Sequence, residues 1–180
     1  MWKNVEYIAI DWNFLEKKRC EMISFCGVDN CKVDGAGRVR FAQRVVDDFL
    51  CRCQGEVVLF GLPEGAVAVY PQEVYREMRR REVGDLDAAG TSYLVRRNLR
   101  RFGAMAHPAV VSAQGRVTLP EFLQKHAGIS AGCEVKIVGV EIGVEIWNTS
   151  RFDTEMQDIE QQNHAERQNE ISSCVKGDEK

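Results

Sequence analysis

The chain has 180 residues and a formal net charge of −3, with 24 basic and 27 acidic side chains, and 44% of its residues are hydrophobic. These proportions are ordinary for a globular protein, and the length suits one domain or two small ones. No apolar run in the sequence reaches the roughly 18 residues of a membrane helix, so no membrane partner is expected. The negative total argues mildly against a polyanionic partner.

The charge is unevenly distributed along the chain. The segment from Asp153 to Lys180 holds eight acidic and three basic residues, which leaves 21 basic and 19 acidic residues for the rest. The body is therefore slightly basic. The first part of the acidic segment can continue a helix. Its end, from Ser172 to Asp178, is predicted to be disordered because a polar terminal segment buries little apolar surface.

Cysteine and histidine spacing indicates neither a metal site nor an active site. None of the seven cysteines forms a C-x-x-C pair, and none of the three histidines stands at metal-ligand spacing from a cysteine. Cys51-Arg52-Cys53 lacks the spacing of redox pairs, and no nucleophilic triad or phosphate-binding glycine loop is evident. We therefore expect no metal, no cofactor, no small-molecule substrate and no enzymatic activity.

The chain contains an internal repeat with an offset of 78 residues. Residues 33–42 (VDGAGRVRFA) align with 111–120 (VSAQGRVTLP), and 55–61 (GEVVLFG) with 133–139 (CEVKIVG). A third block aligns after deletion of one residue. Three blocks in one order indicate a duplication. In chain order we predict an N-terminal extension (1–24), a first module (25–81), an arginine-rich linker helix (82–106), a second module (107–157) and a polar acidic tail (158–180).

Both modules are predicted to have the same order of elements. A short strand leads into a turn in which glycine precedes arginine, and a second short strand leaves that turn. A short helix, two strands joined by a tight turn, and a closing helix follow. The expected helices are 43–51, 71–81, 120–127 and 149 onward, and the expected strand pairs are 56–60 with 66–70 and 135–140 with 143–147.

Arginines are concentrated around the junction between the modules. The predicted linker helix from Leu86 to Met105 has apolar residues at helical spacing and no acidic residue between Thr91 and Ala106. The preceding helix has arginines with acidic neighbours. Each cluster is either a solvated helix face or a contact to phosphate. The clusters are Arg76, Arg79, Arg80 and Arg81, and then Arg96, Arg97, Arg100 and Arg101.

Arg38 and Arg116 stand at equivalent points of the two predicted turns. In the first turn, Asp34 can pair with Arg38 or cap the loop, and glycine beside the arginine tolerates a positive φ. This pattern is either purely structural or it presents two exposed cations to DNA, since a guanidinium meets phosphate or guanine with two hydrogen bonds. We predict DNA contacts from Arg38 and Arg116, with Arg40 or Arg96, Arg97, Arg100 and Arg101 adding phosphate contacts. The residues predicted to orient the turns are Asp34, Gly37, Ser112 and Gly115.

Several short segments occur in the order seen in the MraZ family, which this chain resembles over about residues 25–156. They are 25–27 (FCG), 34–38 (DGAGR), 69–71 (VYP), 104–106 (AMA), 115–120 (GRVTLP), 126–129 (HAGI) and 144–147 (VEIW). The resemblance implies an α+β, mainly β fold in which two tandem copies form an AbrB-like swapped-hairpin β-barrel with short helices.

The resemblance also implies a function. It implies a cytoplasmic, nucleoid-associated homo-oligomer, assembled as a ring, that binds repeated boxes of double-stranded DNA. These boxes lie upstream of its own operon in the division and cell-wall gene cluster, and binding tunes transcription there, with repression expected.

The family signature, an Asp-x-x-x-Arg turn in each copy, is only partly present. It maps onto Asp34 and Arg38 and onto Ser112 and Arg116, so the second turn lacks the acid. Three cationic or polar positions usual in the family are changed, at Ala36, Gln114 and Gln124, and Ala42 replaces a proline. Each missing cation removes about one phosphate contact, which several subunits acting together can offset. The alternative is an assembly module of the same fold that has lost specific DNA binding.

Overall fold

A computed structural model describes residues 25–83 and 92–177, with side chains described as far as residue 167. These ranges contain eight strands and five helices. The strands are β1 (Val28–Lys32), β2 (Arg38–Arg40), β3 (Glu56–Gly61), β4 (Val67–Pro71), β5 (Ala106–Val110), β6 (Arg116–Thr118), β7 (Glu134–Gly139) and β8 (Val144–Asn148). The helices are α2 (Gln43–Cys53), α3 (Gln72–Val83), α4 (Tyr93–Met105), α5 (Glu121–Ala127) and α6 (Thr149–Gly177). None of these helices is both long and apolar enough to cross a membrane.

Six strands form an antiparallel sheet in the order β1-β7-β8-β4-β3-β5, and β2 and β6 form a separate two-stranded antiparallel ribbon. The α+β class is confirmed. The sheet is open, however, because β1 and β5 are edge strands that do not pair with each other, so it is not the predicted closed barrel. The prediction that the fold is mainly β is also wrong. The described helices contain more residues than the described strands, and α6 alone has 29 residues.

Strand pairing relates the two halves of the chain by the offset found in the sequence. Val28 lies opposite Val138 in the pair β1–β7. In the pair β5–β3, Ala106 lies opposite Phe60. Ala106 stands 78 positions after Val28, and Val138 stands 78 positions after Phe60. Each edge strand therefore pairs with a strand of the other half, and the halves share one sheet.

The central strands are buried on both faces of the sheet. All five residues of β4 and the last five of β3 are buried, which explains their continuous apolar sequence. On one face, Leu59 and Val69 pack with α2, α5 and the ribbon. On the other face, Phe60 and Tyr70 belong to a second cluster with α3 and α4, in which Phe60 stacks on Phe102 with ring centroids 5.3 Å apart.

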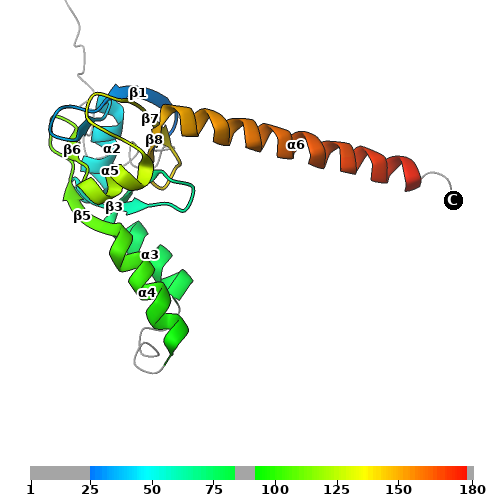
Figure 1. Cartoon of the computed structure of the whole chain (residues 1–180), viewed down its shortest axis with the longest axis horizontal. Helices are drawn as coiled ribbons and strands as arrows, with labels where there is room; N and C mark the ends of the chain where they lie inside the picture. Colours follow the sequence, from blue (N-terminus) through cyan, green and yellow to red (C-terminus); the bar gives the residue numbers. More distant parts are fainter. Residues whose placement is uncertain (1–24, 84–91, 178–180) are drawn as a thin grey trace, which may run out of the picture.

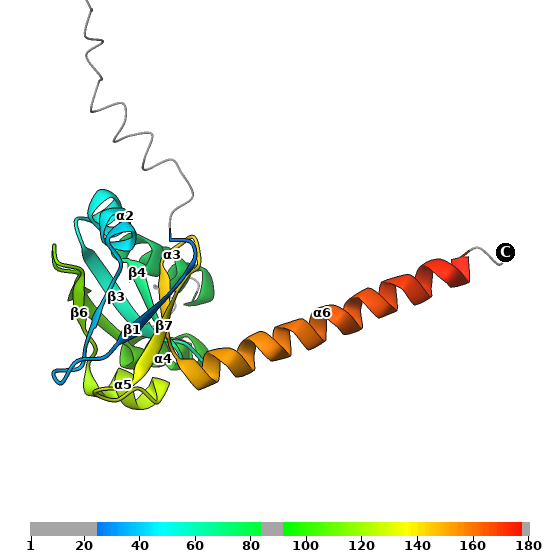
Figure 2. The same cartoon turned by 90° about the horizontal axis from the view of Figure 1, so that it is seen from above.

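The predicted helices of the two modules begin and end within two residues of the expected positions, and the linker helix begins at Tyr93. Gly128 ends α5 in the left-handed conformation, and Ser92 caps α4 by accepting a hydrogen bond from the N–H of Val95. The predicted start of the linker helix at Leu86 lies outside the described residues. The prediction of disorder from Ser172 is wrong as far as Gly177, because no proline or glycine interrupts α6 between Thr149 and Lys176. Figures 1 and 2 show α6 extending from the sheet as one long projection.

Candidate nucleic-acid interface

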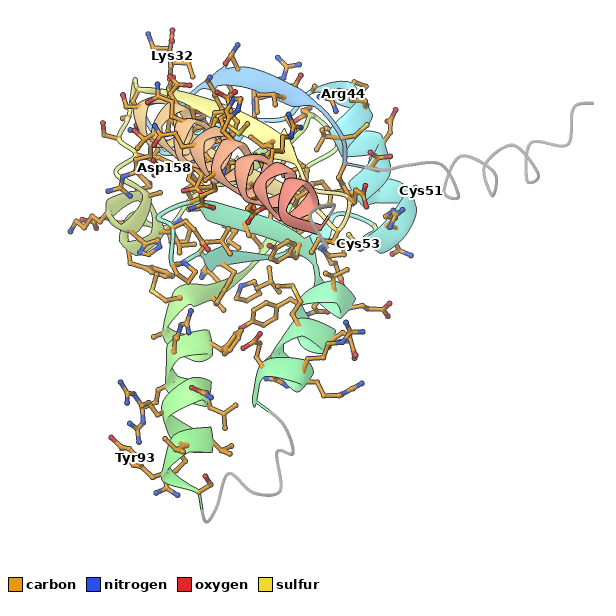
Figure 3. All side chains as sticks on the ribbon, turned by 90° about the vertical axis from the view of Figure 1, so that its right-hand side faces the viewer. Lys32, Arg44, Cys51, Cys53, Tyr93 and Asp158 are labelled. Carbon is orange, nitrogen blue, oxygen red and sulfur yellow. The ribbon has the colours of Figure 1, made fainter. Side chains whose placement is uncertain are left out.

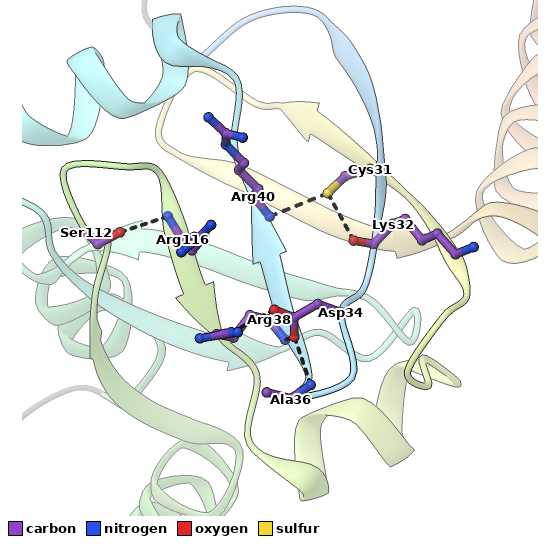
Figure 4. A network of polar contacts seen from close by, with 8 residues as sticks. All are labelled: Cys31, Lys32, Asp34, Ala36, Arg38, Arg40, Ser112 and Arg116. Atoms are coloured by element: carbon purple, nitrogen blue, oxygen red, sulfur yellow. Dashed lines mark hydrogen bonds and ion pairs between the residues drawn. The ribbon is translucent and has the colours of Figure 1, made fainter.

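The ribbon of β2 and β6 brings the two predicted turns together. Arg38 pairs with Thr118, Val39 with Val117, and Arg40 with Arg116. Val39 and Val117 are buried in the core, whereas the four flanking residues are exposed. Since side chains alternate across a strand, Arg38, Arg40 and Arg116 share the outer face of the ribbon. We call these three residues, which Figure 4 labels, and Thr118, which pairs with Arg38, the ribbon face.

In the first turn, Asp34 binds both ends of the loop. Its Oδ1 accepts hydrogen bonds from the backbone N–H groups of Ala36 and Arg38, both at 2.9 Å. Its Oδ2 accepts from Nε of Arg38 at 2.7 Å. These bonds, the backbone bond from Arg38 first among them, lower the pKa of Asp34. The ion pair uses only Nε, so within the described part of the chain the two terminal nitrogens of Arg38 have no bonded acceptor.

The second turn has the same backbone path with a weaker side-chain contact. The N–H of Ser112 donates to the carbonyl of Arg116 at 3.0 Å, as Asp34 does to Arg38 at 2.9 Å. Ser112 Oγ accepts one hydrogen bond, from the N–H of Arg116 at 3.0 Å. Serine has no second oxygen for the guanidinium, so Arg116 is not held as Arg38 is.

Both turns require glycine and are attached to the opposite strand. Gly37 has φ +72° and Gly115 has φ +77°, a region that other residues rarely adopt. The carbonyl of Gly37 accepts from the N–H of Leu119 at 2.9 Å, and that of Gly115 accepts from Phe41 at 2.8 Å. Each turn is thus fixed to the residue that follows the other ribbon strand.

The arginines of α4 are not brought to the ribbon face. Arg97, Arg100 and Arg101 are exposed and Arg96 is half-buried on the hairpin of α3 and α4, which projects from the sheet away from β6 (Figure 1). On α3, Arg80 and Arg81 both pair with Glu77, at 2.9 and 3.0 Å. The predicted phosphate-binding arginines therefore fall into two separate regions.

Two residues near the ribbon were not predicted to have a positive role. Thr118 lies on the ribbon face opposite Arg38, and Gln124 Nε2 donates to the carbonyl of Leu119 at 2.6 Å beside the first turn. Gln124 stood out in the sequence only as a missing arginine, and the place of Thr118 depends on a register that the sequence does not contain. The described residues include no group of three or more potential metal ligands.

Comparison with known proteins identifies the family of this fold. A protein-family model described as "MraZ protein, putative antitoxin-like" matches residues 106–172. A transcriptional regulator MraZ of Lachnoclostridium phytofermentans is 31% identical over 136 residues, which cover 74% of this chain and 88% of that protein. The chain belongs to the MraZ family. The MraZ of Thioalkalivibrio sulfidiphilus is also 31% identical, over 69% of this chain and 79% of its own length, and that of Herminiimonas arsenicoxydans is 27% identical over 71% and 84%.

The resemblance to MraZ found in the sequence is thereby confirmed. These relatives are named as regulators of transcription, so membership of the MraZ family also agrees with the prediction that the chain is not an enzyme.

Proposed function

We propose that this chain is a transcriptional regulator that binds double-stranded DNA through the ribbon face. The observation that carries the proposal is the register of β2 and β6, which places Arg40 directly opposite Arg116 with Arg38 on the same exposed face. Like charges opposite each other in a ribbon destabilise it. Binding of an anion to this face would relieve the repulsion between the arginines. Two-stranded ribbons also fit the grooves of DNA.

The turn residues would fix the position of the cations. Asp34 orients Arg38 and leaves its terminal nitrogens for phosphate or guanine, while Gly37, Gly115 and Ser112 set the backbone of the two turns. The other predicted phosphate contacts, Arg96, Arg97, Arg100 and Arg101, lie on a separate projection and are not part of the proposed DNA-binding face.

The operator and the assembly follow from the MraZ resemblance. We propose binding to repeated boxes upstream of the chain's own operon in the division and cell-wall cluster, repression there, and a nucleoid location. One subunit has only three arginines on its ribbon face, so a ring of subunits on several boxes is needed for tight binding. The equal offset in the strand registers supports two duplicated halves with exchanged hairpins.

A gel-shift assay with the upstream DNA tests the ribbon face. Each arginine in contact with a base edge contributes about 1–3 kcal/mol, so Arg38→Ala with Arg116→Ala should weaken binding at least about 30-fold. The matched control is Arg80→Ala with Arg81→Ala, which removes the same charge from a helix that faces elsewhere and should bind as the wild type does. Both variants should keep the wild-type mass in light scattering. Undiminished binding by the first variant would refute the assignment.

The second candidate is an oligomeric assembly module that has lost specific DNA binding. The single hydrogen bond of Ser112, where Asp34 makes three, favours it, because Arg116 is not oriented toward a ligand. Salt-sensitive and sequence-selective binding to the upstream fragment would rule this candidate out.

A further inference from the structure

A groove of about 340 Å³ lies on the outer face of β7 and β8, beside the first turns of α6. Its apolar wall includes Val138, Trp147 and Phe152. Met156 and Ile159, also in the lining, are 39% and 38% exposed. Apolar side chains that remain this exposed around a groove indicate a surface that binds another chain.

The equivalent surface in the first half of the chain is covered by α4. There Phe60, Tyr70 and Tyr75 pack in one cluster with Phe102 of α4. Val138 stands 78 positions after Phe60, and Trp147 and Phe152 stand 77 positions after Tyr70 and Tyr75, so the groove is built from the equivalent residues. Among the described helices, none covers the groove as α4 covers its counterpart. The shape of the groove is therefore suited to a helix.

The groove differs from its counterpart in being acidic. Glu145 takes the position of Ala68, Glu155 takes that of Met78, and Glu64 adds a third carboxylate. Within the described part of the chain none of the three forms a salt bridge. Burial raises the pKa of Glu145, and the charges of Glu64 and Glu155 raise it further. The groove therefore favours a helix with cationic side chains.

The chain has such a helix in α4. One face of α4 packs on the second cluster through Val95, Leu99 and Phe102. On its exposed surface, Tyr93 and Leu94 are 61% and 66% exposed, and Arg97, Arg100 and Arg101 form no salt bridge with a described residue. Figure 3 shows Tyr93 at the end of α4 farthest from the sheet.

A chain cannot place its own α4 in its own groove. The hairpin of α3 and α4 and the helix α6 leave the sheet in different directions (Figure 1), and α4 is already held on the other half of the sheet by Phe102. We propose that the groove between α6 and β8 binds the exposed face of α4 from a second copy of the chain. The arginines of α4 meet the three carboxylates, and Tyr93 and Leu94 cover Met156 and Ile159.

This interface joins two different surfaces. Such head-to-tail contacts generate rings when the rotation closes. The inference rests on the assembly proposed above and adds the surfaces that form it.

Charge exchange tests the interface in the full-length chain. A groove variant, Glu64→Lys with Glu155→Lys, and a helix variant, Arg97→Glu with Arg101→Glu, each place like charges together. Each variant should weaken self-association at least about 100-fold, which light scattering reports as loss of the wild-type mass. Mixed in equal amounts, the two variants offer each other complementary surfaces at both contacts, so the mixture should regain the large mass.

Controls separate assembly from folding and from DNA binding. Arg80→Glu with Arg81→Glu reverses the same charge on α3 and should keep the wild-type mass, and circular dichroism should show that all variants are folded. Ile159→Glu, at an exposed apolar position of the groove, should also weaken assembly.

Three results would each overturn the inference. The first is a wild type that is monomeric in light scattering. The second is a groove or helix variant that keeps the wild-type mass. The third is a mixture of the two folded variants that does not regain the wild-type mass. If the wild type assembles normally but does not retain the upstream DNA, the proposed function is contradicted and the inferred interface is not.

Discussion

At the scale of single residues, the two turns have one backbone path and different side-chain support. Asp34 receives three hydrogen bonds from the first turn, and Ser112 receives one from the second. The carboxylate at Asp34 is bound in its ionised form, which is the reason for its lowered pKa. The stability of the first turn should therefore depend on pH, while that of the second should not.

Asp34→Asn tests this difference. A lowered pKa means that the ionised group stabilises the folded state above its ordinary pKa of 3.8, and that this contribution is lost as the pH falls through the lowered value. The melting temperature of Asp34→Asn should lie below that of the wild type at neutral pH, and the difference should shrink in acid. Ser112→Ala, which removes a neutral acceptor, should show a difference independent of pH. Equal pH profiles for the two variants would contradict the role of the ion pair.

The glycines of the turns should differ in their tolerance of alanine. A Cβ at Gly115 would lie 2.7 Å from Cγ2 of Val46 and 2.9 Å from the carbonyl oxygen of Phe41, whereas at Gly37 the obstacle is the flexible end of Gln124. Gly115→Ala should lower the free energy of unfolding by about 2–3 kcal/mol, and Gly37→Ala by about 1–2 kcal/mol. Gly35→Ala, with no atom within 4 Å of the added Cβ, is the control for urea unfolding. If the free energy of unfolding falls more for Gly37→Ala than for Gly115→Ala, the atoms around Gly115 can move to accommodate the added Cβ and the prediction is wrong.

At the scale of elements, the packing of α4 centres on Phe102, the one buried residue of that helix. Phe102 is 8% exposed, stacks on Phe60 and also lies edge-on to Tyr75 with ring centroids 6.5 Å apart. Phe102→Ala should lower the free energy of unfolding by about 3 kcal/mol, because it leaves a cavity under α4. Asn98→Ala, on the exposed side of the same helix, should change it by less than about 0.5 kcal/mol. Urea unfolding followed by circular dichroism measures both, and equal effects would show that α4 does not depend on this cluster.

The elements were more predictable than their pairing. The four longest predicted strands appear within two residues of their expected ends, because apolar runs and glycine turns are local signals. The pairing of β1 with β7 and of β5 with β3 is not local, and no period in the sequence specifies a partner. For the same reason the sequence named Arg38, Arg40 and Arg116 but not the face that joins them, nor Thr118 within it. The extent of α6 was missed because a polar composition suggests disorder even where no residue breaks the helix.

At the scale of the whole molecule, charge is separated in space as well as along the chain. The acidic residues from Asp153 to Glu170 are on α6, which leaves the sheet on the side opposite to β6 (Figure 1). The ribbon face is thus kept apart from the charge that makes the total negative. A net charge of −3 is therefore compatible with the proposed binding to DNA. Because one subunit has few cations on its ribbon face, that binding would require the proposed assembly.

The salt dependence of DNA binding should show how many subunits of one assembly contact DNA. Each phosphate contact contributes about 0.9 to the slope of log Kd against log salt concentration. If Arg40 contacts phosphate, Arg40→Ala should reduce the slope by about 0.9 for each bound subunit, so a reduction of about 2 or more indicates that several subunits of one assembly bind together. Arg80→Ala, which removes an arginine paired with Glu77 on α3, should leave the slope unchanged. An unchanged slope for Arg40→Ala would remove Arg40 from the interface. A reduction near 0.9 with normal assembly would mean that a single subunit binds, and the need for several bound subunits would then be wrong.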